Sequence, residues 1–115
     1  MADFKRLEVW KASHQLVLQI YRQTANFPRH ELFGLTAQMR RAAVSIPANI
    51  AEGRGRDTDP DFARFLTMSL GSVSELEYFL ILATDLEYPS SPQLVADLAS
   101  VGRRLQSFRS SLRQK

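Results

Sequence analysis

Apolar residues recur every three or four positions along most of this 115-residue chain, with polar residues between them. This spacing is typical of helices that bury one face, and no segment of comparable length alternates like a strand. The pattern predicts four helices. The first covers residues 4–26 and the second 31–53, while the third runs from 58 or 59 to a turn at 88–92, and the fourth follows from 92. The predicted fold class is therefore all-α.

Local signals mark the ends of these helices. Pro28 disfavours helix at the residue before it and closes the first helix. Gly53 and Gly55 are expected to end the second helix. The pairs Asp59-Pro60 and Ser91-Pro92 suit the N-cap and first turn of the third and fourth helices.

Each predicted helix carries a row of mostly apolar side chains that we expect to face a common core. The row of the first helix is Leu7, Trp10, His14, Val17 and Tyr21. The row of the second is Leu35, Met39, Ala42, Ile46 and Ile50. The row of the third is Phe62, Leu66, Ser69, Val73, Leu76, Leu80 and Ala83. The row of the fourth is Leu94, Leu98, Val101, Leu105, Phe108 and Leu112. A second apolar edge should make the third helix the most buried, and its members are Phe65, Met68, Phe79, Leu82 and Leu86.

The connections between these helices are short, roughly four to six residues each, which makes sequential helices antiparallel neighbours. We therefore predict an antiparallel, up-down-up-down four-helix bundle that forms a single domain over residues 1–115. Pro47 has no N–H to donate to the carbonyl of Ala43, and its ring crowds that carbonyl. A kink in the second helix is expected near Pro47.

The stretch RRAAVSIPANIAEGRGR, residues 40–56, places a polar row beside the apolar row of the second helix. Buried polar side chains need partners, and the third helix offers Ser72 and Glu75. Gly71 beside them is small enough to permit a close approach of the two helices. The alternative is a chance set of partly exposed polar residues. The predicted polar network consists of Arg41, Ser45, Asn49, Glu52, Ser72 and Glu75.

Composition narrows the class of protein. There is no cysteine, so disulfides and thiolate metal sites are excluded. No apolar run approaches the roughly 18 residues of a membrane span, and the charged N-terminus does not resemble a signal peptide. We expect a cytoplasmic protein with no membrane partner.

Charge is strongly segregated along the chain. Residues 1–56 hold nine Lys/Arg and four Asp/Glu, a net charge of +5. Residues 57–97 hold one arginine and eight acids, a net charge of −7, and residues 98–115 hold five basic residues and no acid. Such segregation favours charge-complementary packing between subunits or a basic face for polyanions. Solvated helix faces with mixed neighbours are the plain alternative.

The sequence offers little that resembles catalytic chemistry. His14 and His30 are the only histidines, and His14 reads as a core histidine. The Glu-x-x-His pairs of di-iron bundles are absent. No serine sits in a nucleophile-elbow pattern, and Gly53-x-Gly55 follows a helix instead of a strand. We expect a non-enzymatic protein with no catalytic residues, cofactor or metal.

The candidate binding residues are arginines near the end of the second helix and along the fourth. In an oligomer they could line one mouth or wall and raise the positive potential there. Some of them could instead pair with Asp57, Asp59 or Asp61, which would quench that potential. The candidate nucleic-acid-binding residues are Arg54, Arg56, Arg103, Arg104, Arg109 and Arg113.

Several segments together resemble a known family. They are FKRLEVWKASHQLVLQIY near the N-terminus, SIPANIAEG in the second helix and GSVSELE in the third. The chain resembles the four-helix-bundle family named for proteins encoded in intervening sequences of bacterial 23S ribosomal RNA genes, with Ser69 where alanine is commoner. That family is similar to the accessory variability proteins of diversity-generating retroelements, which are pentameric barrels that associate with a reverse transcriptase and nucleic acid. The resemblance implies a homopentamer around a basic-lined channel and no catalytic residues.

Two functions remain open at this point. The chain could be a non-enzymatic, homo-oligomeric scaffold that binds RNA, DNA or a nucleic-acid enzyme. It could also be a protein–protein interaction scaffold that binds no nucleic acid and uses its charges for subunit packing. Salt dependence separates the two, because phosphate contacts make affinity fall steeply as salt rises.

Overall fold

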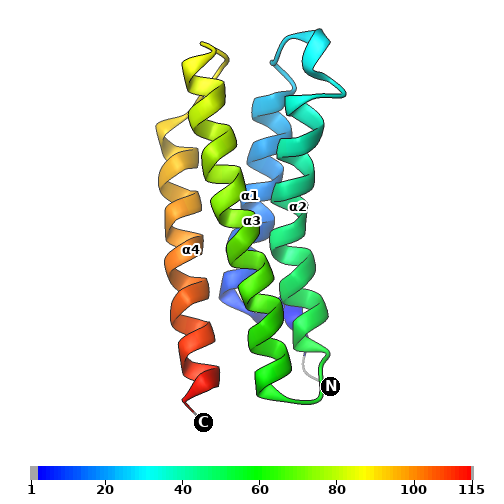
Figure 1. Ribbon diagram of the computed structural model, residues 1–115, viewed down its shortest axis with the longest axis vertical. Helices are drawn as coiled ribbons and strands as arrows, with labels where there is room; N and C mark the ends of the chain where they lie inside the picture. Colours follow the sequence, from blue (N-terminus) through cyan, green and yellow to red (C-terminus); the bar gives the residue numbers. More distant parts are fainter. Residues whose placement is uncertain (1–2, 115) are drawn as a thin grey trace.

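The computed structural model describes residues 3–114 and contains four long helices, with no strand among the described residues. The elements are η1 Phe4–Arg6, α1 Glu8–Thr24, η2 Arg29–Glu31, α2 Leu35–Arg54, α3 Asp59–Asp85 and α4 Pro92–Arg113. The colours of Figure 1 run up α1, down α2, up α3 and down α4. α1 packs against α2 and α4, and α3 packs against the same two helices from the other side. The all-α bundle predicted from the sequence is confirmed.

The helix starts follow the sequence signals closely. Ser91 caps α4, because its hydroxyl accepts a hydrogen bond from the Leu94 N–H at 3.4 Å. α3 is capped by Thr58, whose hydroxyl accepts from the Asp61 N–H at 3.2 Å. The expected cap at Asp59 is therefore off by one residue. Asp59 lies in the first turn, where its charge favours the helix N-terminus.

The predicted core rows of α2, α3 and α4 are correct. All the predicted residues of α2 and α3 are buried, and in α4 only Phe108 is half-exposed. The row predicted for α1 is only partly correct, because Val17 is buried but Tyr21 is 42% exposed and Trp10 and His14 lie at the edge of the core. His14 stacks on Trp10 with ring centroids 5.2 Å apart. The side chains that α1 buries are Val9, Ser13, Leu16, Val17, Ile20 and Thr24.

Burial of α3 also differs from the prediction. Ten of its 27 residues are buried, against nine of 20 in α2, so α3 is not the most buried helix. Of its second apolar edge, Phe65 and Phe79 are buried within the same chain, and only Met68 and Leu86 are exposed. The reason is that α3 lies between α2 and α4, and each of these two helices covers one side of it. By length and apolar composition alone α3 is the one described helix that could cross a membrane.

α2 is continuous through Pro47, which is buried within it, so the predicted kink stays a prediction. α2 ends at Gly55, its C-cap residue, as predicted, but Gly53 does not end the helix. It is buried inside the helix, and a Cβ added there would lie 2.7 Å from the Cβ of Phe65 and 2.8 Å from the ring of Phe62. Gly71, predicted to allow close approach, is exposed, and a Cβ there would meet nothing within 4 Å. The glycine that lets α2 approach α3 is Gly53.

One end of the bundle is tied together by Glu31 in η2. Its carboxylate accepts hydrogen bonds from the Leu35 N–H at the start of α2, at 3.1 Å, and from the Tyr88 hydroxyl, at 2.8 Å. The backbone N–H of Leu35 and then the Tyr88 hydroxyl lower the pKa of Glu31. Tyr88 follows the end of α3, so this contact joins the α1–α2 loop to the α3–α4 turn. No local signal in the sequence predicts this contact.

Candidate nucleic-acid interface

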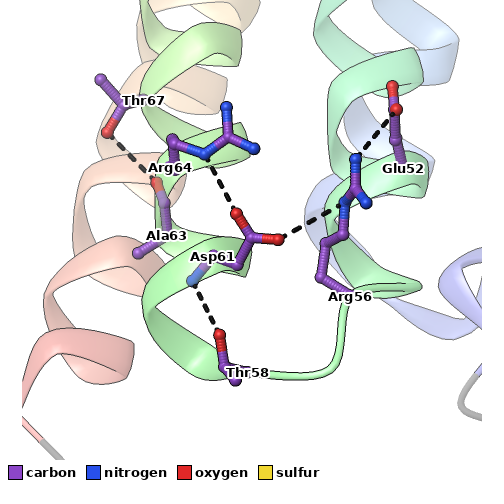
Figure 2. Close-up of polar contacts among 7 residues, drawn as sticks. All are labelled: Glu52, Arg56, Thr58, Asp61, Ala63, Arg64 and Thr67. Carbon is purple, nitrogen blue, oxygen red and sulfur yellow. Dashed lines mark hydrogen bonds and ion pairs between the residues drawn. The ribbon is translucent and has the colours of Figure 1, made fainter.

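The two candidate arginines at the end of α2 are largely occupied by contacts within the chain. Figure 2 shows Asp61 between Arg56 and Arg64, with Glu52 on the other side of Arg56. Arg56 lies 3.4 Å from Glu52 and 3.6 Å from Asp61, and its guanidinium stacks over a phenylalanine ring. Arg54 is half-buried with its guanidinium 5.9 Å from the centroid of another ring. The positive potential of this turn is thus partly neutralised by neighbouring acids.

The adjacent residues Arg103 and Arg104 on α4 point to different sides of that helix. Successive residues of a helix are turned by about 100°. Arg103 lines a groove between α3 and α4 together with Ser74, while Arg104 lines a hollow beside Glu8 of α1. Both arginines are exposed, and within residues 3–114 neither forms an ion pair or hydrogen bond.

Arg109 and Arg113 converge on Thr67 of α3. The Thr67 hydroxyl accepts from Arg109 at 3.2 Å and from Arg113 at 3.5 Å, and it donates to the Ala63 carbonyl at 3.1 Å. This contact holds both guanidinium groups on the α3–α4 side. Thr67 was not predicted as a site residue, since nothing local in the sequence places it opposite α4.

The groove beside these arginines has a volume of about 350 Å³. Gly102 lines this groove between α3 and α4, and a Cβ there would lie 3.3 Å from Val73. Its basic side chains are Arg103 and Arg109, and its one acid is Glu77. Arg113 lies beyond the lower end, in a larger hollow with Asp57 and Asp59.

Three guanidinium groups therefore follow one another down the α3–α4 side of the molecule. Ten residues separate Arg103 from Arg113, which is about 15 Å along a helix axis. We call Arg103, Arg109 and Arg113 the arginine stripe. A row of cations of this length suits a linear polyanion better than a single small anion, because successive phosphates can each meet a cation.

The predicted polar network is present in its centre and absent at its edges. The Asn49 side chain donates to the Ser45 carbonyl at 2.9 Å and to the Ser45 hydroxyl at 3.0 Å. The Ser72 hydroxyl bonds that same hydroxyl at 2.8 Å and links α2 to α3. Arg41 and Glu75 are exposed, and no hydrogen bond between residues 3–114 joins them to this centre. Glu52 pairs with Arg56 instead.

The described residues contain no group of three or more His, Asp or Glu side chains that could hold a metal ion. The half-buried serines of α2 and α3 are engaged in the hydrogen bonds just given. The arginine stripe is thus the arrangement whose chemistry points towards a ligand.

Comparison with known proteins identifies the chain's relatives. A family model described as 23S rRNA-intervening sequence protein matches residues 5–107. A crystal structure from Bacteroides thetaiotaomicron, described as a protein with unknown function from the S23 ribosomal protein family, is 27% identical with a TM-score of 0.77. The match covers 88% of this chain and 97% of that one. No curated protein matches the chain.

Proposed function

The chain belongs to the family of 23S rRNA-intervening sequence proteins, and from that premise we propose that it is a non-enzymatic scaffold that binds nucleic acid through the arginine stripe. The scaffold is a cytoplasmic homo-oligomer, with five copies arranged so that the stripes repeat around a basic surface. The pentameric count comes from the sequence resemblance to the retroelement accessory proteins. A nucleic-acid enzyme would be recruited to the same assembly through the bound RNA or DNA.

The observation that carries this proposal is the position of the three arginines on one side of α4. Two of them share Thr67, and the third is exposed without an intramolecular ion pair among the described residues. Guanidinium groups held in this way are available for phosphate oxygens, which they bind with two hydrogen bonds each. Residues 3–114 contain no evident base-reading element, so we expect binding that is largely independent of sequence, with Kd of about 10⁻⁴–10⁻⁶ M at physiological salt.

The test measures binding of a labelled single-stranded RNA and a labelled DNA duplex over a range of salt concentrations. The variant R103Q/R109Q/R113Q removes three charges from the stripe. The control R6Q/R22Q/R29Q removes three exposed charges from α1, η1 and η2. On duplex DNA, loss of three phosphate contacts should flatten the slope of log K against log salt by about 2–3 units, since each contact contributes about 0.9.

The control variant should keep the wild-type slope. Equal slopes for the stripe variant and the wild type would remove the stripe from the function. Absence of binding by all three proteins would favour the second candidate, a protein–protein interaction scaffold with no nucleic-acid binding. That candidate is supported by exposed apolar side chains such as Phe33 and Tyr78, which are 93% and 58% exposed.

A further inference from the structure

Two exposed apolar surfaces lie on opposite sides of the bundle. The first, which we call the aromatic patch, surrounds Phe33 on the α1–α2 side. It consists of Tyr21, Leu32, Phe33, Arg40, Arg41 and Val44. The second, which we call the acidic groove, lies between α3 and α4 and has a volume of about 370 Å³. It includes Glu77, Leu80, Ile81, Asp85, Val95 and Leu98.

The first surface carries an exposed aromatic ring, and the second is a groove that can receive one. Phe33 projects from the loop before α2 and is 93% exposed, which is unusual for a large aromatic side chain. The acidic groove is concave and mostly apolar, with Ile81 and Val95 each about half-exposed at its rim. An aromatic ring seated in such a groove would remove apolar surface from water on both sides of the contact.

The two surfaces also have complementary charges. The charged groups of the aromatic patch are Arg40 and Arg41, and those of the acidic groove are Glu77 and Asp85. Arg40 is fixed by hydrogen bonds from its side chain to Thr24 and to the Tyr21 carbonyl. Arg41 is exposed. A like-charged partner would be repelled from either surface, so each surface selects the other.

Both surfaces lie at the same end of the molecule. The patch is formed by the end of α1, the loop and the start of α2, while the groove is formed by the end of α3 and the start of α4. Figure 1 shows these segments together at the upper end, with α2 on one side and α4 on the other. A patch and groove at equal heights join neighbours without a shift along the bundle axis. Such a head-to-tail contact closes a ring when the rotation between neighbouring copies divides a full turn.

We propose that the partner of the aromatic patch is the acidic groove of a second copy of this chain. This head-to-tail contact is the subunit interface of the oligomer. The inference therefore rests on the proposed function. The groove shares Glu77 and Ala99 with the neighbouring basic groove, so the contact ends where the arginine stripe begins. Arg109 lies ten residues below Ala99, about 15 Å further along α4.

The test uses light scattering after size exclusion on three single variants at one protomer concentration, with circular dichroism to check that each is folded. Phe33→Asp alters the patch and Ile81→Asp alters the groove. Tyr78→Asp is the matched control, because Tyr78 is an exposed aromatic residue of α3 outside the groove. We expect wild type and Tyr78→Asp to form the oligomer, and each of the other two to have the monomer mass of 13.1 kDa.

Mixing the two monomeric variants gives the decisive result. The Ile81→Asp chain retains an intact patch and the Phe33→Asp chain an intact groove, so one contact can form between them and no further copy can add. The mixture should therefore have twice the 13.1 kDa mass of one chain. The inference is overturned if either variant keeps the wild-type mass or if the mixture stays monomeric. A monomeric wild type would instead refute the oligomer of the proposed function itself.

Discussion

Replacing either of two helical glycines by alanine should change stability in opposite directions, because only one of them lies in a close helix contact. An alanine inside a helix is favoured over glycine by roughly 1 kcal/mol. Gly71 is exposed, and a Cβ there would meet no atom within 4 Å. Gly71→Ala should therefore keep most of this gain and stabilise the protein by about 0.5–1 kcal/mol.

Gly53→Ala receives the same helical gain and a larger penalty. The added Cβ would lie 2.7 Å from the Cβ of Phe65, an atom fixed to the backbone of α3, so α2 and α3 would have to move apart. Overfilling a packed contact costs about 1–3 kcal/mol, and a backbone-anchored neighbour favours the upper part of that range. After the helical gain, the expected net loss is about 1–2 kcal/mol.

The assay is urea unfolding of wild type and both variants, followed by far-UV circular dichroism at one protomer concentration, since assembly makes apparent stability concentration-dependent. The midpoint should rise for Gly71→Ala and fall for Gly53→Ala. Midpoints that move in the same direction would refute the assignment of Gly53 as the contact glycine, as would a Gly53→Ala protein with wild-type stability.

Two further predictions concern the end of the bundle near α3. Glu87 has a positive φ of 63°, so Glu87→Gly should stabilise the protein by roughly 0.5–1 kcal/mol, the relief of left-handed strain less the extra freedom of the unfolded chain. Glu87→Gln, which removes only the charge, should not reproduce that gain in urea unfolding. The Leu35 N–H and the Tyr88 hydroxyl lower the pKa of Glu31. Its contribution is therefore present above the unfolded pKa near 4.5 and lost as pH falls through the lower folded pKa. Thermal melts from pH 7 downward should show a shallower acid decline for Glu31→Gln than for wild type.

The sequence was sufficient for the core of three helices because their apolar rows are unambiguous. In α2, for example, Met39, Ile46 and Ile50 follow one another at intervals of seven and four residues and are fully buried. In α1 two rows compete, and the large rings of Trp10 and Tyr21 made the outer row look like the core. Such rings have a polar edge that suits a boundary position.

The row that α1 buries was not recognised in the sequence because it contains two hydroxyl residues. Ser13 and Thr24 are buried, and each donates its hydroxyl to a carbonyl of its own helix, at 2.9 Å to Trp10 and at 2.7 Å to Ile20. Bonded in this way, small polar side chains can enter a core at little cost. A hydropathy pattern did not reveal this in α1, because Ser13 and Thr24 are polar by type and their bonds to backbone carbonyls are not visible in the sequence.

The candidate site depended on contacts between helices, which the chain order does not give. Six arginines were equivalent in the sequence. In the structure they differ in the residues they contact. Arg56 pairs with Asp61, Arg109 donates a hydrogen bond to Thr67, and Arg104 points towards α1. Likewise Gly53 and Gly71 differ only in the presence of Phe65 across the helix contact. Residue type predicted the kind of chemistry, and the packing of α3 against α2 and α4 selected the residues.

In the proposed assembly the two ends of the bundle have separate tasks. The upper end carries the aromatic patch and the acidic groove, while the arginine stripe continues down α4 to Arg113 near the lower end. Three phosphate contacts give only weak binding by a single chain, but a ring repeats them around its circumference. Several weak contacts on one polyanion act together, because after the first has formed the others are effectively intramolecular. On this reasoning subunit assembly and nucleic-acid binding belong to one mechanism, in which the apolar contacts at one end set the spacing of the arginines towards the other.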